Sequence, residues 1–113
     1  MDKKKLMDAG IDYDDGIGRL MGNAEMYESF LQMFLKDDSF AALEKAMAEK
    51  DYQKAFVEAH TLKGVVGNLS MKKLYDELVP FVDMLRNGTD IAAAVEFFPS
   101  VEKAYTETMA AIR

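Results

Sequence analysis

The sequence predicts an all-α protein, an antiparallel four-helix bundle with one or two short additional helices at its N-terminal end. Apolar residues recur with helical spacing through almost the whole chain, and no stretch alternates long enough with the period of two that a strand requires. Capping and turn residues divide this pattern into helices with brief connections, which favour antiparallel neighbours. We expect one domain over residues 1–113, large enough to bury a single core.

The N-terminal third begins with two short helical segments. Lys3 to Asp8 forms the first, which Gly10 stops, and Asp14 to Met21 forms the second, which Gly22 and Asn23 stop. A stripe with the spacing i, i+3, i+4, i+7, i+8 then predicts a longer helix with a core face. The members of that stripe are Tyr27, Phe30, Leu31, Phe34 and Leu35. A shorter stripe of Phe40, Leu43 and Met47 follows the capping sequence 37–39.

Three longer helices complete the expected bundle. Asp51 is suited to cap a helix from about Tyr52 to Asn68, whose apolar stripe is Tyr52, Ala55, Ala59, Leu62, Val66 and Leu69. A second stripe runs over 71–85 and ends at the helix-stopping pair 87–88, and a third runs over 91–112. Pro80 and Pro99 lie inside these patterns, so each should bend its helix or mark a break, and Pro99 favours a new helix start at Ser100.

Composition excludes several classes of function. The net charge of −6 argues against nucleic-acid binding, which needs clustered basic residues, and the run Lys3–Lys5 reads as a solvated tail. The absence of cysteine excludes disulfides and thiolate chemistry, and one histidine is too few for a typical zinc or haem site. No apolar run is long enough to cross a membrane and no signal peptide is visible, so a cytoplasmic location is expected.

The one histidine of the chain lies in a helix that contains two glycines. Each glycine costs a helix about 1 kcal/mol relative to alanine, so two of them need an explanation. At about 100° per residue, Gly67 lies about 20° from His60 on one side and Gly64 about 40° on the other, with Lys63 about 60° away. The apolar stripe is centred about 130° from the histidine, so His60 should face solvent. This arrangement suits the approach of a bulky, anionic partner to the imidazole.

The segment His60-Thr61-Leu62-Lys63-Gly64, followed by Gly67-Asn68-Leu69, resembles the histidine phosphotransfer (HPt) domain of multistep two-component phosphorelays. The resemblance extends through 22–27 and 30–34 upstream and 85–88 downstream, and covers roughly Ile11 to Gly88. It implies a phosphoryl carrier that accepts phosphate from a receiver-domain phosphoaspartate on His60 and passes it to another receiver aspartate. A free imidazole is largely neutral at cytoplasmic pH, so a nucleophilic nitrogen is available.

The resemblance also implies roles for the neighbours of His60. Lys63 would supply a positive charge to the phosphoryl group, and Gly64 would leave steric clearance for the partner. The surrounding residues expected to contact the partner are Gln53, Phe56, Gly67 and Met71. No phosphate-binding loop or kinase motif is present, so we expect a phosphotransfer intermediate that cannot take phosphate from ATP unaided, and not an enzyme with an ATP site. The resemblance implies no cofactor of its own, with Mg²⁺ supplied by the partner receiver domain. The implied partners are response-regulator receiver domains and a hybrid histidine kinase, bound by a monomer.

The sequence departs from the family pattern after the Lys-Gly pair, where many members have small residues and a later glycine. This chain has Val65, Val66 and, in place of the glycine, Ser70. Serine is a mild change if the position caps the next helix, and strained if the position needs a positive φ. Two other functions stay open: an adaptor that docks receivers or kinases without being phosphorylated, and the substrate domain of a chemotaxis-type histidine kinase.

Overall fold

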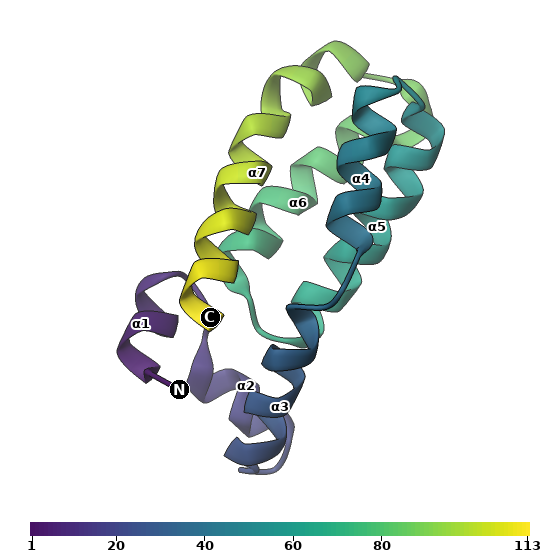
Figure 1. The fold of residues 1–113 in the computed structure, drawn as a ribbon. Coiled ribbons are helices and arrows are strands. Elements are labelled where there is room, and N and C mark those ends of the chain that lie inside the picture. The colour runs from purple at the N-terminus through teal and green to yellow at the C-terminus, as the bar shows by residue number, and fades with distance from the viewer.

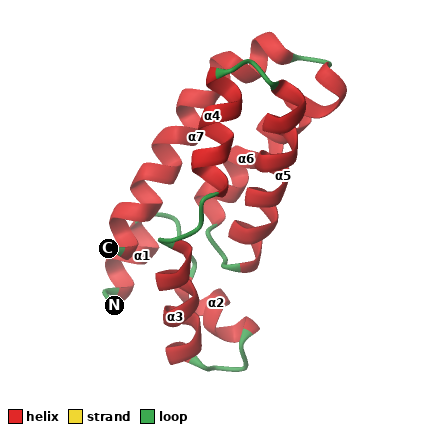
Figure 2. Ribbon diagram, turned by 45° about the vertical axis from the view of Figure 1, so that its right-hand side comes forward, coloured by secondary structure: helices red, strands yellow, loops and turns green.

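The computed structural model describes residues 1–113 as helices joined by short connections (Figure 2). The helices are α1 (Lys3–Asp8), α2 (Tyr13–Arg19), α3 (Ala24–Phe34), α4 (Ser39–Ala48), α5 (Tyr52–Asn68), α6 (Lys72–Leu85) and α7 (Ile91–Ile112), with a 3₁₀ turn (Arg86–Gly88) before α7. Strand pairing is limited to one isolated bridge between Ile11 and Met71. The predicted all-α class is confirmed.

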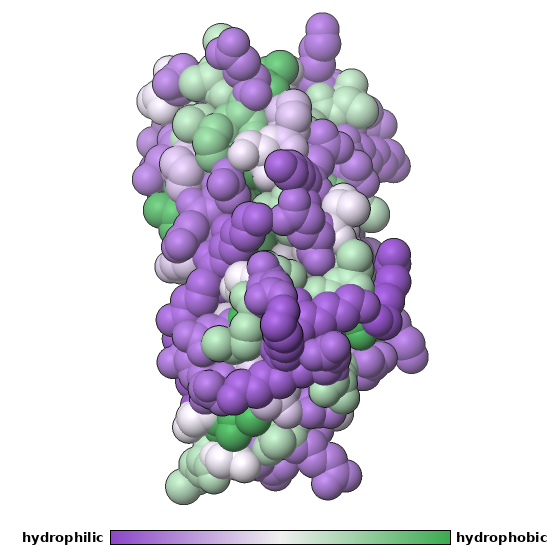
Figure 3. Space-filling view, turned by 90° about the vertical axis from the view of Figure 1, so that its left-hand side faces the viewer, coloured by the Kyte–Doolittle hydropathy of each residue, from purple (hydrophilic) through white to green (hydrophobic).

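Helices α4 to α7 lie side by side as a bundle, and α1, α2 and α3 gather at one end of it, near both termini (Figure 1). The molecule is elongated, 41 × 22 × 21 Å. Figure 3, seen from the side of α7 and α1, shows a largely hydrophilic face with scattered apolar groups. None of the helices combines the length and the apolar character that crossing a bilayer requires.

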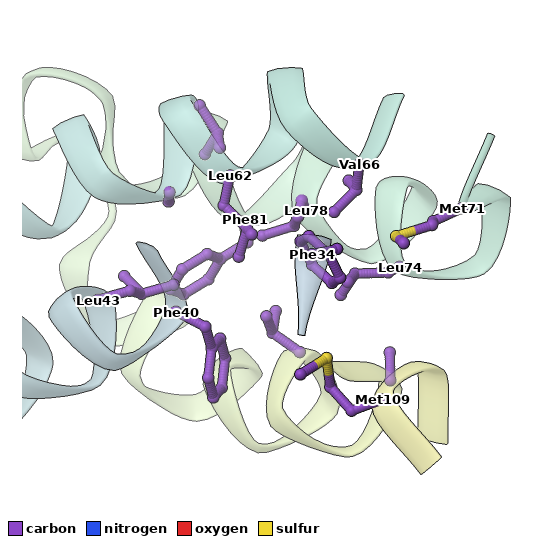
Figure 4. Packing of buried hydrophobic residues seen from close by; sticks show 14 of the residues in the cluster. Phe34, Phe40, Leu43, Leu62, Val66, Met71, Leu74, Leu78, Phe81 and Met109 are labelled. Atoms are coloured by element: carbon purple, nitrogen blue, oxygen red, sulfur yellow. The ribbon is translucent and has the colours of Figure 1, made fainter. Parts of the chain in front are cut away.

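The core lies along the bundle axis, and Figure 4 shows Phe34, Phe40, Leu62 and Phe81 among the side chains that fill it. Aromatic rings tie α4 and α6 to α7. The ring centroids of Phe40 and Tyr105 are 3.8 Å apart, and those of Phe81 and Phe98 are 5.5 Å apart. The four apolar residues of α5 that fall on this side have no exposed surface: Ala55, Ala59, Leu62 and Val66. One face of α5 is thereby fixed against the core.

Helix α5 begins and ends as elementary capping rules require. The side chain of Asp51 accepts a hydrogen bond from the Lys54 backbone N–H, 3.2 Å away, and confirms the predicted cap. At the other end, the backbone N–H of Met71 donates to the carbonyl of Val66, and that of Ser70 donates to the carbonyl of Gly67. This pair of bonds defines a Schellman turn, which places the residue after the C-cap in the left-handed region.

Ser70 occupies that left-handed position, with φ of +57°, so the strained alternative is the one that the fold adopts. A residue other than glycine loses roughly 1–2 kcal/mol there. The capping alternative is wrong, because the N-cap of α6 is Met71. The hydroxyl of Ser70 instead donates to the Asp15 carboxylate, 2.6 Å away, and offsets part of the strain.

The N-terminal helices are attached to this turn by several hydrogen bonds. The Tyr27 hydroxyl donates to the carbonyl of Leu69 at 2.6 Å, and the backbone N–H of Asp12 donates to that of Ser70 at 2.8 Å. Burial raises the pKa of Tyr27, so this hydroxyl stays protonated and keeps its donor role. Gly16 permits the contact, since a Cβ there would stand 2.2 Å from the Tyr27 ring. Helices α2 and α3 are thus held against the end of α5.

Two details of the predicted elements are wrong. Pro99 lies inside a continuous α7, and no new helix starts at Ser100, whose hydroxyl donates to Glu77 of α6 instead. Pro80 also lies inside α6, which does not break there, so of the two outcomes expected for Pro80 the bend stays a prediction. Phe30 was expected in the core stripe, but its side chain is 37% exposed because α3 packs through Tyr27, Leu31 and Phe34.

Candidate functional site

The middle of α5 presents His60 to solvent. His60 is exposed although it lies between the buried residues Ala59 and Leu62 in the sequence, as the helical register predicts. The imidazole lies against Phe56, with ring centroids 5.9 Å apart. No hydrogen bond or ion pair holds the imidazole, so both ring nitrogens are free to meet a second molecule.

Gly64 lies one turn beyond His60 and is also exposed. A Cβ built on Gly64 meets no atom within 4 Å, so no packing contact requires glycine at this position. The helix therefore bears the cost of a glycine without a structural gain. What the glycine leaves is a bare stretch of backbone beside the imidazole, open to anything that approaches His60.

Gly67 has a different environment. A Cβ there would stand 3.1 and 3.2 Å from two carbons of the Tyr75 ring, so close helix packing is one reason for this glycine. Gly67 is half-buried between α5 and α6, and it contributes less open surface than Gly64. Its expected contact with a partner stays a prediction.

Lys63 is half-buried and makes no ion pair within the molecule. It lines an open groove of about 510 Å³ between α5 and α6, together with Gly64, Gly67 and Tyr75. An unpaired ammonium on a flexible stem, one turn from the imidazole, can interact with an anionic group bound to His60.

The remaining predicted contacts fall on both sides of His60. Gln53 is exposed and, with the half-buried Phe56, lines a groove near the turn that follows α6. The Arg86 guanidinium lies 5.2 Å from the centroid of the Phe56 ring, in a cation–π contact. Gln53 and Phe56 are therefore accessible near His60, on the side toward the start of α5.

The expected contact of Met71 with a partner is wrong, because Met71 is fully buried. Figure 4 shows its side chain in the core near Val66 and Leu74. The cause is the Schellman turn, in which the second residue after the C-cap packs against the residue three positions before the cap. Those residues are Met71 and Val66, which are also joined by the backbone hydrogen bond of the turn.

Sequence reasoning missed an apolar surface on α3. Met26, Phe30 and Met33 are 44%, 37% and 64% exposed, and their spacing of four and three residues places them on one face. Phe30 and Met33 line a groove with Val65 and Leu69 of α5. The signal was present as a second apolar stripe beside the core stripe of the same helix. This exposed apolar surface is a candidate contact area for a partner.

The fold and this site define a class of protein: a small helical bundle that exposes one unpaired histidine beside a cleared glycine and a free lysine. A comparison with family models matches residues 25–111 to the Hpt domain. The chain therefore belongs to the Hpt domain family, and the predicted family is confirmed. Searches of curated proteins and of solved structures gave no match. Hpt domains act in phosphotransfer within two-component signalling, as phosphocarriers rather than ATP-using catalysts, and interact with receiver domains and kinases.

Proposed function

We propose that this protein carries a phosphoryl group on His60 between two receiver domains. The exposed imidazole beside the open surface at Gly64 is the observation that supports this proposal most directly. An imidazole nitrogen attacks the phosphorus of a receiver phosphoaspartate, so a P–N bond forms while the P–O bond to the carboxylate breaks. The carboxylate of a second receiver then attacks the phosphohistidine, and the P–N bond breaks in turn.

Lys63 contributes charge to this transfer. Phosphoryl transfer depends mainly on positioning and on stabilising the charge of the phosphoryl oxygens. Lys63 offers a free ammonium, while the receiver supplies Mg²⁺ and the acidic pocket that holds it. The proposed carrier acts as a monomer in the cytoplasm, with a hybrid histidine kinase as one source of phosphorylated receiver.

The receiver docks around His60 on a surface that α3 and α5 share. The exposed side chains of Met26, Phe30 and Met33 provide apolar area, and Asn68 of α5 lines both the groove beside α3 and the groove beside α6. Asn68 follows His60 and Gly64 at one-turn intervals along the outer side of α5. An apolar centre with a polar margin is the usual composition of a protein–protein interface.

The decisive experiment removes the nucleophile. The protein is incubated with a receiver domain that carries ³²P-labelled phosphoaspartate, in the presence of Mg²⁺. We expect an acid-labile, base-stable label on the wild type and none on His60→Gln, because the chain has no other histidine. Circular dichroism should show the same helical content for both proteins, since His60 makes no hydrogen bond that the fold needs.

Label that survives His60→Gln would exclude His60 as the carrier. A wild type that takes label from a histidine kinase with ATP, but from no phosphorylated receiver, would instead favour the kinase substrate domain. A wild type that binds receivers without any label would favour the adaptor.

The steric role of Gly64 is tested with Gly64→Gln. The added side chain enters open space, and replacement of a glycine within a helix stabilises the helix by up to about 1 kcal/mol. The melting temperature should therefore stay the same or rise. Transfer from a receiver should fail, since the side chain stands beside the imidazole. Phosphoramidate is small enough to pass it and should still label His60. Ala110→Gln, which adds a side chain at an exposed position of α7, is the matched control and should transfer normally.

A further inference from the structure

The groove between α5 and α6 carries a concentration of positive charge that the chain as a whole lacks. Its charged lining residues are Arg19, Lys63, Lys72 and Asp76. Asp15 belongs to the same cluster, because it forms ion pairs with Arg19 and Lys72. The cluster therefore contains three cations and two carboxylates. The local balance is +1, whereas the chain has a net charge of −6. This groove borders Gly64, directly beside the site of phosphorylation.

One of these cations comes from a part of the chain outside the family match. The match begins at residue 25, while Arg19 is the last residue of α2. Helix α2 nevertheless reaches the groove, because Asp15 of the same helix accepts a hydrogen bond from Ser70 at the α5–α6 turn. A segment added before the matched region thus completes one wall of the groove.

The guanidinium of Arg19 is held in place and still available. Its Nε donates to Asp15, 3.0 Å away, and the other two nitrogens have no hydrogen-bond partner within the molecule. The same carboxylate accepts a hydrogen bond from the Ser70 hydroxyl, 2.6 Å away. The hydrogen bond from Ser70 and, to a smaller extent, the one from Arg19 lower the pKa of Asp15. Asp15 therefore stays ionised near neutral pH and orients the arginine. A fixed guanidinium with free terminal nitrogens is suited to bind a carboxylate with two parallel hydrogen bonds.

We propose that this groove receives an acidic segment of the receiver domain, and that Arg19 is a specificity-determining residue for that partner. The proposal rests on the proposed function, in which a receiver approaches His60 with an acidic, Mg²⁺-binding pocket. A groove with excess positive charge beside His60 complements acidic side chains around such a pocket. The rest of the chain is acidic and repels them, so the charge steers the receiver into one orientation.

The test compares Arg19→Gln with the wild type over a concentration series of phosphorylated receiver domains from the same organism, each loaded with acetyl phosphate and Mg²⁺. For the receiver that transfers best, the half-saturating concentration should rise about three- to tenfold at low ionic strength, with the maximal rate little changed. The difference should shrink at about 0.5 M NaCl, where the Debye length is roughly 4 Å. Arg19→Lys should retain part of the wild-type behaviour, since it keeps the charge and loses the fork geometry.

Three controls separate this proposal from others. Lys103→Gln removes the same charge from exposed surface of α7 and should leave the half-saturating concentration unchanged. Phosphoramidate labelling of Arg19→Gln should equal that of the wild type, because the proposed contact is with the receiver. Lys72→Gln removes a groove cation that lies outside α2 and leaves the Arg19–Asp15 pair in place, and it should change the half-saturating concentration in the same direction even if Arg19→Gln were poorly folded.

The proposal is overturned if Arg19→Gln and Lys72→Gln both transfer like the wild type. It is also overturned if Lys103→Gln shows the same loss, which would indicate a general charge effect. Slower phosphoramidate labelling of Arg19→Gln would place the arginine on the phosphoryl group instead of the receiver. A wild type without receiver-dependent label would refute the proposed function itself, so the two failures are distinguishable.

Discussion

The outward and inward faces of α5 differ in what their residues contact. On the outward face His60 and Gly64 are exposed, the histidine has no hydrogen-bond partner, and a Cβ on the glycine would touch nothing. On the inward face, the four residues at the centre of the apolar stripe are fully buried in the core: Ala55, Ala59, Leu62 and Val66. Along the helix, His60 and Gly64 each lie within two residues of a buried member of the apolar stripe.

This contrast separates residues that stabilise the helix from residues that the helix only displays. The inward side chains account for its burial and position, since each contributes apolar area removed from water. The outward residues contribute little to stability, and Gly64 lowers it. A substitution on one face should therefore change the free energy of unfolding, and a substitution on the other should change phosphotransfer. Substitutions at Leu62, Lys63 and Gly64 test that separation.

The largest expected effect on stability is at Leu62. Leu62→Ala removes buried methyl and methylene groups next to the aromatic core, and should lower the free energy of unfolding by about 2–5 kcal/mol. Urea denaturation followed by circular dichroism measures this change. Transfer per folded molecule should equal that of the wild type, although Leu62 is only two residues from His60. A variant with normal stability would show that the core does not rely on this face of α5.

The inward face was the more predictable from sequence. Helical spacing places Ala55, Ala59, Leu62 and Val66 on one stripe, and the capping role of Asp51 follows from its position before that stripe. The same spacing predicts an exposed His60, because the histidine lies far from the stripe. These properties depend only on the periodicity of one helix.

Properties that depend on how helices meet were not predictable. The burial of Met71 follows from a turn in which Ser70 adopts a positive φ, and this turn is held by Asp15 of a helix distant in sequence. The exposure of Phe30 likewise follows from which side of α3 faces the bundle. The distinction between Gly64 and Gly67 depends on the position of the Tyr75 ring on a neighbouring helix. A pattern in one segment contains no information on these contacts.

A smaller effect, confined to phosphotransfer, is expected at Lys63. Lys63→Ala removes one charge-assisted contact, worth roughly 1.5–3 kcal/mol, so transfer should slow by about ten- to a hundredfold and not stop. Stability should change by no more than about 0.5 kcal/mol, because Lys63 makes no ion pair. Rapid-quench measurement of phosphohistidine formation gives the rate. Lys54→Ala, at an exposed position on a different side of α5, should transfer at the wild-type rate. Equal rates for Lys63→Ala and the wild type would make Lys63 an ordinary surface lysine.

The smallest expected effect is on stability, at the two glycines of α5. It compares Gly64, which has open space around it, with Gly67, which lies close to the Tyr75 ring. Gly64→Ala places a methyl group in open space, so it should raise the free energy of unfolding by up to about 1 kcal/mol. Gly67→Ala has the same intrinsic advantage, but its Cβ would stand 3.1 Å from the Tyr75 ring, which must move by a few tenths of an ångström. The gain at Gly67 should therefore be smaller than the gain at Gly64.

Thermal unfolding of both variants in the wild-type and Tyr75→Ala backgrounds isolates the cause of that difference. Removal of the ring should bring the gain at Gly67 up to that at Gly64, because Tyr75 supplies the only atoms that a Cβ on Gly67 would meet within 4 Å. The gain at Gly64 should be the same in both backgrounds. If Gly64→Ala destabilises the protein, or if Tyr75→Ala leaves the difference unchanged, the surface beside His60 is not free of packing constraints. The division of α5 into a structural and a displayed face would then have to be redrawn at Gly64.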